Sequence, residues 1–138
     1  MALSDNPLFG QLADAAVLNR PAAEQLLREH PELIHATNRL GETALHFLAV
    51  ENYGDGVVFL ARHGAPLNAR NHFERTPLME AAMVGATEAV RQLLACGADP
   101  SFQTPDGETV WDLLDPESAT ELLSIFREHG FVPPERSA

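Results

Sequence analysis

Hydrophobic residues recur along this chain at a fixed interval of about 33 residues. Three series show the interval: Leu45, Leu78 and Trp111; Val57, Val90 and Leu123; and Leu60, Leu93 and Phe126. Within each interval, apolar positions lie three or four residues apart, the spacing that places them on one face of a helix. A glycine follows each second apolar cluster, at Gly64, Gly97 and Gly130. The pattern therefore predicts a repeated pair of short helices that ends at a glycine.

The clearest pair of predicted helices follows Thr76. Threonine is a good N-cap and Pro77 suits the first helical position, so we predict a helix over 77–84. A second helix is predicted over 87–96. It ends before Gly97, because glycine enters the left-handed backbone conformation at low cost.

The first pair is a degenerate copy of this unit. Asn6 and Pro7 open its first helix. The apolar face of that helix is predicted to contain Leu8, Leu12, Ala15 and Ala16. The helix ends at Asn19, which holds the repeat position of Asn52 and Gly85. We expect all three of these residues to be left-handed, as a tight turn between helices requires.

The remaining helices follow from the same signals. In the first repeat, a helix over 21–29 is predicted to turn Leu26 and Leu27 inward, and Pro31 stops it in place of glycine. In the second repeat, Thr43 caps a helix to about residue 50, and residues 57–62 belong to its partner. In the last repeat, Asp115 and Pro116 shorten the first helix, and the second covers 118–129. Between the helix pairs, polar β-turn fingers are predicted at 35–42, 65–75 and 98–108. The predicted shared core includes Leu45, Leu48, Leu60, Leu78, Ala81 and Leu93.

Three segments in register carry a common motif. They read GETALHFLA (41–49), ERTPLMEAA (74–82) and GETVWDLL (107–114), and each is a variant of T-P-L-H-x-A at the same position of the repeat. The chain therefore resembles an ankyrin-repeat protein over nearly all of its length. The resemblance implies an all-α solenoid of about four helix-turn-helix repeats with β-turn fingers, in which the first and last repeats act as caps. The expected divisions of this single domain are 4–36, 37–69, 70–102 and 103–132, with a tail at 133–138.

Composition narrows the classes of partner. The chain has 20 acidic residues, nine basic residues that are all Arg, and a net charge of −11. This balance argues against nonspecific nucleic-acid binding and against anionic membrane surfaces. The N-terminal segment lacks the basic region of a signal peptide, and no apolar run reaches about 18 residues. Because Cys96 is the single cysteine, no intrachain disulfide can form, which fits a reducing compartment such as the cytoplasm. We expect the protein to be a cytoplasmic monomer.

The residues that could carry chemistry have structural interpretations. His30, His63 and His129 share one repeat position beside the end of a helix, where a polar side chain can meet terminal carbonyls. His46 stands at the histidine of the T-P-L-H motif, which in the family orients neighbouring loops through hydrogen bonds. Cys96 lacks the electropositive setting of a reactive thiolate. No nucleotide-binding, zinc-protease or nucleophile-elbow motif occurs. We therefore expect no catalytic residue, cofactor or metal.

In the family that the chain resembles, partners bind the concave face made by the finger tips and the first helix of each repeat. Carried over by repeat position, that face contains Arg39, Leu40, Glu42, Val50, Glu51, His72, Phe73, Arg75, Met83, Val84, Asp106 and Glu108. Leu40 and Phe73 are one full repeat apart, so they should project side by side from adjacent fingers.

The leading functional hypothesis is a non-enzymatic protein-binding module: an adaptor, or an inhibitor or regulator of a specific partner protein. One alternative is an enzyme or metal-dependent protein that uses the histidines and carboxylates. A further alternative is self-association through Leu40 and Phe73. The sign of the partner's charge stays open, because the middle fingers carry arginines within an acidic chain.

Overall fold

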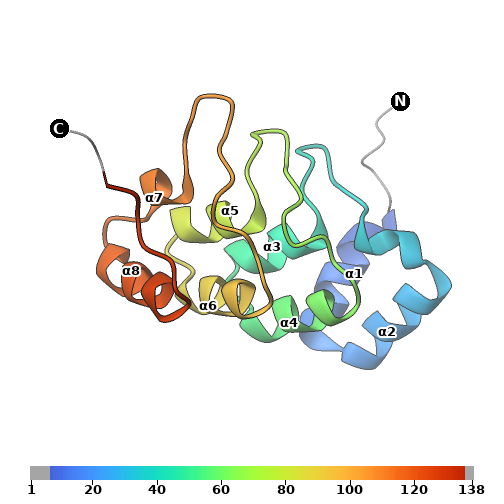
Figure 1. The fold of residues 1–138 in the computed structure, drawn as a ribbon. Helices are drawn as coiled ribbons and strands as arrows, with labels where there is room; N and C mark the ends of the chain where they lie inside the picture. The colour runs from blue at the N-terminus through green and yellow to red at the C-terminus, as the bar shows by residue number, and fades with distance from the viewer. Residues whose placement is uncertain (1–6, 136–138) are drawn as a thin grey trace.

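The computed structural model describes residues 7–135, which form helices and turns without a strand (Figure 1). The elements are α1 (Pro7–Leu18), α2 (Arg20–Glu29), a 3-10 helix η1 (Pro31–Ile34), α3 (Ala44–Val50), α4 (Gly54–Arg62), α5 (Pro77–Met83), α6 (Thr87–Ala95), α7 (Val110–Leu113) and α8 (Ala119–Glu128). The all-α class expected from the periodicity is confirmed. The predicted helices over 77–84 and 87–96 each end one residue earlier than expected.

The helices stack as successive pairs from one end of the molecule to the other. Helices α3, α5 and α7 form a layer beside the projecting loops, and α4, α6 and α8 form a second layer beneath them (Figure 1). The first helices pack on one another in sequence, α1 on α3, α3 on α5 and α5 on α7, and α4 packs on α6 and α6 on α8. Helix α4 contacts the first pair mainly through α1. Three long loops, the fingers, extend from the same edge of the stack. This arrangement places the finger tips and the first helices on one side of the molecule.

A single apolar core runs through all the pairs. The core residues expected from the period are at most 2 % exposed, and these are Leu45, Leu48, Leu60, Leu78, Ala81 and Leu93. Small residues such as Ala49 and Ala82 are also fully buried, which lets neighbouring helices approach closely. At the last pair, the ring of Trp111 packs on that of Phe126 with centroids 4.7 Å apart.

Threonine caps begin the first helices of the middle repeats. The Oγ1 atom of Thr76 accepts a hydrogen bond from the backbone N–H of Met79 at 3.2 Å, and Thr43 makes the equivalent bond to His46 at 3.3 Å. In the last repeat, the Asp112 carboxylate accepts from the N–H and the hydroxyl of Thr109. The bonds donated by Met79, His46 and Thr109 N–H each satisfy a backbone N–H that has no partner within its helix. The predicted caps at Thr43 and Thr76 are confirmed, whereas the predicted cap at Asn6 lies outside the described residues.

Two local expectations for the first repeat are wrong. Asn19 has φ −154° rather than a left-handed angle, because it caps α2 by accepting a hydrogen bond from Ala22 N–H. Its repeat mates Asn52 and Gly85 are left-handed as expected. Leu26 is only half-buried, since it lies on the outer side of the first pair where no repeat of the described chain covers it. Leu27 is buried in the core together with Ala23, whereas Leu26 packs only against the edge of the core.

Candidate partner-binding face

Each finger is closed by a polar residue at one repeat position. The Oδ1 atom of Asn38 accepts from the N–H groups of Leu40 and Glu42, and that of Asn71 accepts from the N–H groups of Phe73 and Arg75. In the third finger Thr104 takes the same place, and its Oγ1 accepts from Glu108 N–H at 3.1 Å. Backbone bonds also link the two ends of each turn, Asn38 to Glu42, Asn71 to Arg75 and Thr104 to Glu108. The finger tips are therefore ordered by internal hydrogen bonds.

The first two fingers are attached to each other. The backbone N–H of His72 donates to the carbonyl of Leu40 at 2.8 Å. The approach is close enough to require glycine at position 41, because a Cβ on Gly41 would lie 2.5 Å from the His72 ring. Gly41 also has φ +74°. Leu40 and Phe73 thus project from fingers whose separation is set by a backbone hydrogen bond.

His46 links the helix layer to the base of the second finger. Its Nδ1 lies 3.0 Å from Thr43 Oγ1, and its Nε2 lies 3.0 Å from the carbonyl oxygen of Arg75. Burial lowers the pKa of His46, an effect partly opposed by the Arg75 carbonyl and by nearby carboxylates. A neutral ring that carries its proton on Nε2 satisfies both contacts. The expected role of His46 in orienting a neighbouring loop is confirmed.

The apolar residues predicted for the binding face lie at different depths. Leu40 is 47 % exposed, Phe73 55 % and Val84 56 %, which is high for large apolar side chains. Val50 and Met83, which hold one repeat position, are half-buried at α3 and α5. These five residues therefore form two levels, finger tips above and helix positions below.

The charged residues predicted for the face are largely paired with one another or with the turns. Arg75 Nη2 lies 3.3 Å from Glu108 Oε1 on the third finger, and its guanidinium lies 5.8 Å from the centre of the Phe73 ring. Glu42 Oε1 accepts from Asn38 Nδ2 at 2.9 Å. The exposed polar and charged members of the predicted set are Arg39, Glu51, His72 and Asp106. The ion pair between Arg75 and Glu108 therefore links the second finger to the third. We infer that these two residues position the fingers, besides belonging to the predicted binding face.

The residue set inferred from sequence omitted a hollow between α1 and α3. It has a volume of about 250 Å³ and is lined by Ala13, Asp14, Val17, Leu18, Phe47, Leu48, Glu51 and Tyr53. Phe47 is 40 % exposed and meets Phe9 edge to face at 6.1 Å. The sequence could have indicated Phe47, because the same repeat position in the neighbouring repeats holds Asp14 and Glu80. An aromatic residue at a position occupied by carboxylates in both neighbouring repeats is not required by the core.

The first helices carry negative charge only. Within the described residues, α1, α3, α5 and α7 contain no Arg, and they contain Asp14, Glu80 and Asp112. The described arginines lie instead on the second helices and the fingers. Two of the finger arginines have carboxylate partners, Arg70 with Glu74 at 3.4 Å and Arg75 with Glu108 at 3.3 Å. The helix side of the face is therefore acidic.

The histidines and the cysteine outside the face have local roles. The Nδ1 atoms of His63 and His129 lie 2.9 Å from the carbonyl oxygens of Phe59 and Ile125, as expected for side chains at helix ends. Burial raises the pKa of the Cys96 thiol, which opposes thiolate formation. Among the described residues, no group of three or more His, Cys, Asp or Glu side chains is placed to hold a metal ion. None of the described helices has the length and apolarity needed to cross a membrane.

Comparison with known proteins identifies the family. A family model described as ankyrin repeats, in three copies, matches residues 12–104, which is more than half of the chain. Human protein phosphatase 1 regulatory subunit 27 is 32 % identical over 63 % of this chain and 56 % of the relative. Human BCL-6 corepressor-like protein 1 is 29 % identical over 88 % of this chain, but over only 8 % of the relative. Mouse SMC5-SMC6 complex localization factor protein 1 is 38 % identical over 44 % of this chain and 6 % of the relative.

The likeness covers the repeats rather than the whole of these relatives. The chain spans a little over half of the phosphatase regulatory subunit and less than a tenth of the other two proteins. Helices α2 to α6 and the first two fingers lie within the segment that the family model matches. On this combined basis, the chain belongs to the family of ankyrin-repeat proteins.

Proposed function

We propose that this chain is a non-enzymatic protein-binding module whose partner docks on the finger face, defined as the finger tips together with α1, α3, α5 and α7. The observation that carries the proposal is the pair Leu40 and Phe73. Both are about half exposed, and both stand on fingers joined by the hydrogen bond from His72 to Leu40. Apolar side chains held outward on an ordered frame are typical of protein-binding surfaces.

Order in the free protein favours binding. The finger turns are closed by Asn38, Asn71 and Thr104, and His46 attaches the second finger to α3. A surface that is already arranged loses little conformational entropy when the partner docks. The same bonds explain how a small chain presents a defined face without a ligand.

The chemistry of the face points to a partner with apolar and basic groups. The helix side offers Phe47, Val84 and the hollow between α1 and α3 as apolar sites. The carboxylates of Asp14, Glu51 and Glu80 surround these sites at α1, α3 and α5. Opposite charges across an interface speed association and set orientation. We therefore expect an apolar segment flanked by Arg or Lys.

A regulatory role fits the comparisons best among the roles open to such a module. One relative, which matches this chain over 56 % of its own length, is named as a regulatory subunit of protein phosphatase 1. We propose that this chain likewise acts by occupying a surface of one target protein. The target itself is to be found by experiment.

Affinity capture with a paired variant tests the face. The double substitution Leu40→Asp with Phe73→Asp removes both apolar tips, and the matched control Val132→Asp changes an equally exposed apolar residue in the C-terminal segment. We expect proteins captured by the unchanged chain and by V132D, identified by mass spectrometry, to be lost with the double variant. The thermal midpoint should stay within a few degrees, because both side chains are on the surface. Unchanged capture by a folded double variant would exclude this face.

A further inference from the structure

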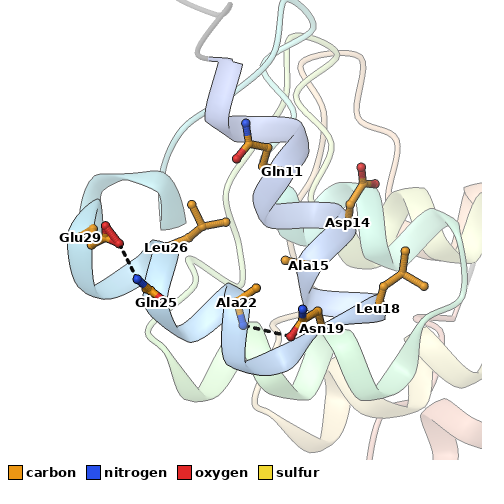
Figure 2. Close-up of a pocket in the computed structure, with 9 residues that line it drawn as sticks. All are labelled: Gln11, Asp14, Ala15, Leu18, Asn19, Ala22, Gln25, Leu26 and Glu29. Atoms are coloured by element: carbon orange, nitrogen blue, oxygen red, sulfur yellow. Dashed lines mark hydrogen bonds between the residues drawn. The ribbon is translucent and has the colours of Figure 1, made fainter.

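A second apolar surface lies at the end of the stack, away from the fingers. Figure 2 shows it as a groove between α1 and α2, with Leu26 pointing toward α1 and Leu18 at the end of that helix. The hollow has a volume of about 520 Å³. We call it the end groove, lined by Gln11, Asp14, Ala15, Leu18, Asn19, Ala22, Gln25, Leu26 and Glu29.

Repeat register shows what kind of surface the end groove is. Ala15 and Leu26 hold the positions that Leu48 and Phe59 occupy in the second repeat. In the second repeat these positions are 2 % and 7 % exposed, because α1 packs against α3 and α4 and the Arg20 guanidinium of α2 lies 5.1 Å from the centre of the Phe59 ring. In the first repeat, Ala15 and Leu26 are only half-buried. The end groove therefore has the form of an interface between repeats whose covering helices are not part of the described chain.

Leu18 enlarges the apolar area beside the groove. It is 83 % exposed, the highest value for a large apolar side chain among the described residues. It lines both the end groove and the hollow beside Phe47 on the finger face. Its repeat mates are Glu51 and Val84, so the repeat does not demand leucine at this position. An exposed leucine between two hollows extends the apolar surface of each.

At the opposite end of the stack, the C-terminal segment of the chain lies beside the last helix pair. Pro133 and Pro134 line a hollow together with Trp111, Leu114 and Leu123. In Figure 1 the C-terminal segment runs back from α8 along the last pair. The two prolines cover the apolar surface of α7 and α8 only in part, because the hollow still has a volume of about 620 Å³. Within residues 7–135, no comparable segment crosses the groove between α1 and α2 (Figure 2).

The negative charge of the end groove indicates which kind of ligand it can bind. Its described lining includes the carboxylates of Asp14 and Glu29 and no Arg. Glu29 is oriented by a hydrogen bond from Gln25 Nε2 to its Oε1 at 3.1 Å. A second copy of this chain is disfavoured, because each copy carries a net charge of −11 and a symmetric contact would bring like carboxylates together. A ligand that complements the groove would therefore have apolar and basic groups.

We propose that the end groove binds one amphipathic α-helix of another protein. The helix would lay an apolar stripe on Ala15, Ala22 and Leu26 and place Arg or Lys residues toward Asp14 and Glu29. Helical structure is inferred because helices are what cover the equivalent positions of the second repeat. Packing an apolar helix face into a groove is a general mode of recognition. The end groove does not include the finger tips, but it shares Asp14 and Leu18 with the hollow beside Phe47. Ala22 and Leu26 line the end groove and not that hollow, so they distinguish the two sites.

The test uses defined peptides and the full chain. One amidated peptide, long enough to form about five helical turns, has a Leu and Ala stripe flanked by Arg, and a matched peptide has Glu at every Arg position. Titration of the ¹⁵N-labelled protein should move the backbone signals of Ala15, Leu18, Ala22 and Leu26 with the basic peptide. The acidic peptide should bind at least tenfold more weakly. Raising the salt concentration should weaken binding of the basic peptide, because exposed charges are screened.

Variants locate the site. Leu26→Arg and, separately, the more exposed Leu18→Arg should each weaken binding of the basic peptide at least tenfold, and circular dichroism checks that each variant is folded. Phe73→Arg and Val132→Arg place the same charge elsewhere on the surface and should leave the affinity unchanged. Absence of binding, or signal changes confined to the fingers, would overturn the proposal. So would equal affinity for the two peptides.

Other occupants of the groove have distinct signatures. Self-association that L18R abolishes in sedimentation measurements would assign the groove to a second copy and overturn the proposal. A tenfold gain in peptide affinity after removal of residues 1–6 would assign it to that segment instead. A constant sedimentation coefficient and an unchanged affinity after the truncation support binding of a partner helix.

Discussion

The side chain of Asn52 in the second repeat caps a helix of the third. Its Oδ1 atom accepts a hydrogen bond from the backbone N–H of Ala89 at 2.9 Å, near the start of α6. Asn52 is also left-handed, with φ 63°. One residue therefore supplies both the turn between α3 and α4 and the missing acceptor of a helix in the next repeat. This contact couples neighbouring repeats, which contributes to cooperative folding of a solenoid.

Substitutions at Asn52 separate the cap from the turn. Asn52→Gly keeps the left-handed turn but loses the cap, so we expect it to reduce the free energy of unfolding by about 0.5–1 kcal/mol. Asn52→Ala loses the cap and adds backbone strain, for a total of about 2 kcal/mol. Urea unfolding followed by circular dichroism gives both values. Equal stability of the alanine and glycine variants would contradict the role of the left-handed turn.

Acidification should destabilise the protein through His46. Burial lowers the pKa of this residue in the folded state, whereas the unfolded chain has the ordinary value near 6.5. The unfolded state therefore binds more protons as the pH falls below about 7, and the free energy of unfolding decreases in that direction. Stability is retained above the unfolded-state pKa and lost as the pH falls toward the lowered folded-state pKa.

The measurement compares the unchanged chain with a variant in which a residue that does not titrate replaces His46. His46→Gln should show a smaller loss of stability between pH 7 and pH 5 in urea titrations, although its stability at pH 7 is lower. The other histidines remain in both chains and contribute equally. Parallel pH profiles for the two proteins would show that His46 does not cause the dependence.

Glycine should be more stable than alanine at position 74. Glu74 has φ 61°, and its repeat mates are Gly41 and Gly107, both with positive φ. A residue with a Cβ in this conformation costs about 1–2 kcal/mol. Both Glu74→Gly and Glu74→Ala remove the half-exposed ion pair with Arg70, which is worth little. We expect the glycine variant to exceed the alanine variant by about 1 kcal/mol in chemical unfolding, the reverse of the order in a helix.

The repeat period determined most of the fold. Core positions such as Leu78 and Leu93 are set by helical spacing within one repeat, and the caps at Thr43 and Thr76 depend on a few adjacent residues. These are local signals, so they can be read without knowing which repeats touch. The finger positions of Leu40 and Phe73 followed from the register for the same reason. Their role in binding remains a proposal.

Tertiary structure decided the features that depend on a missing or unequal neighbour. Leu26 has a core-like spacing, yet it lines the end groove because no repeat of the described chain lies outside it. Asn19 has the same repeat position as Asn52, but it caps its own helix α2 instead of adopting the left-handed turn. The hollow beside Phe47 exists only because α1 and α3 lie side by side. Periodicity specifies which face of a helix is apolar, whereas exposure of that face depends on what packs against it.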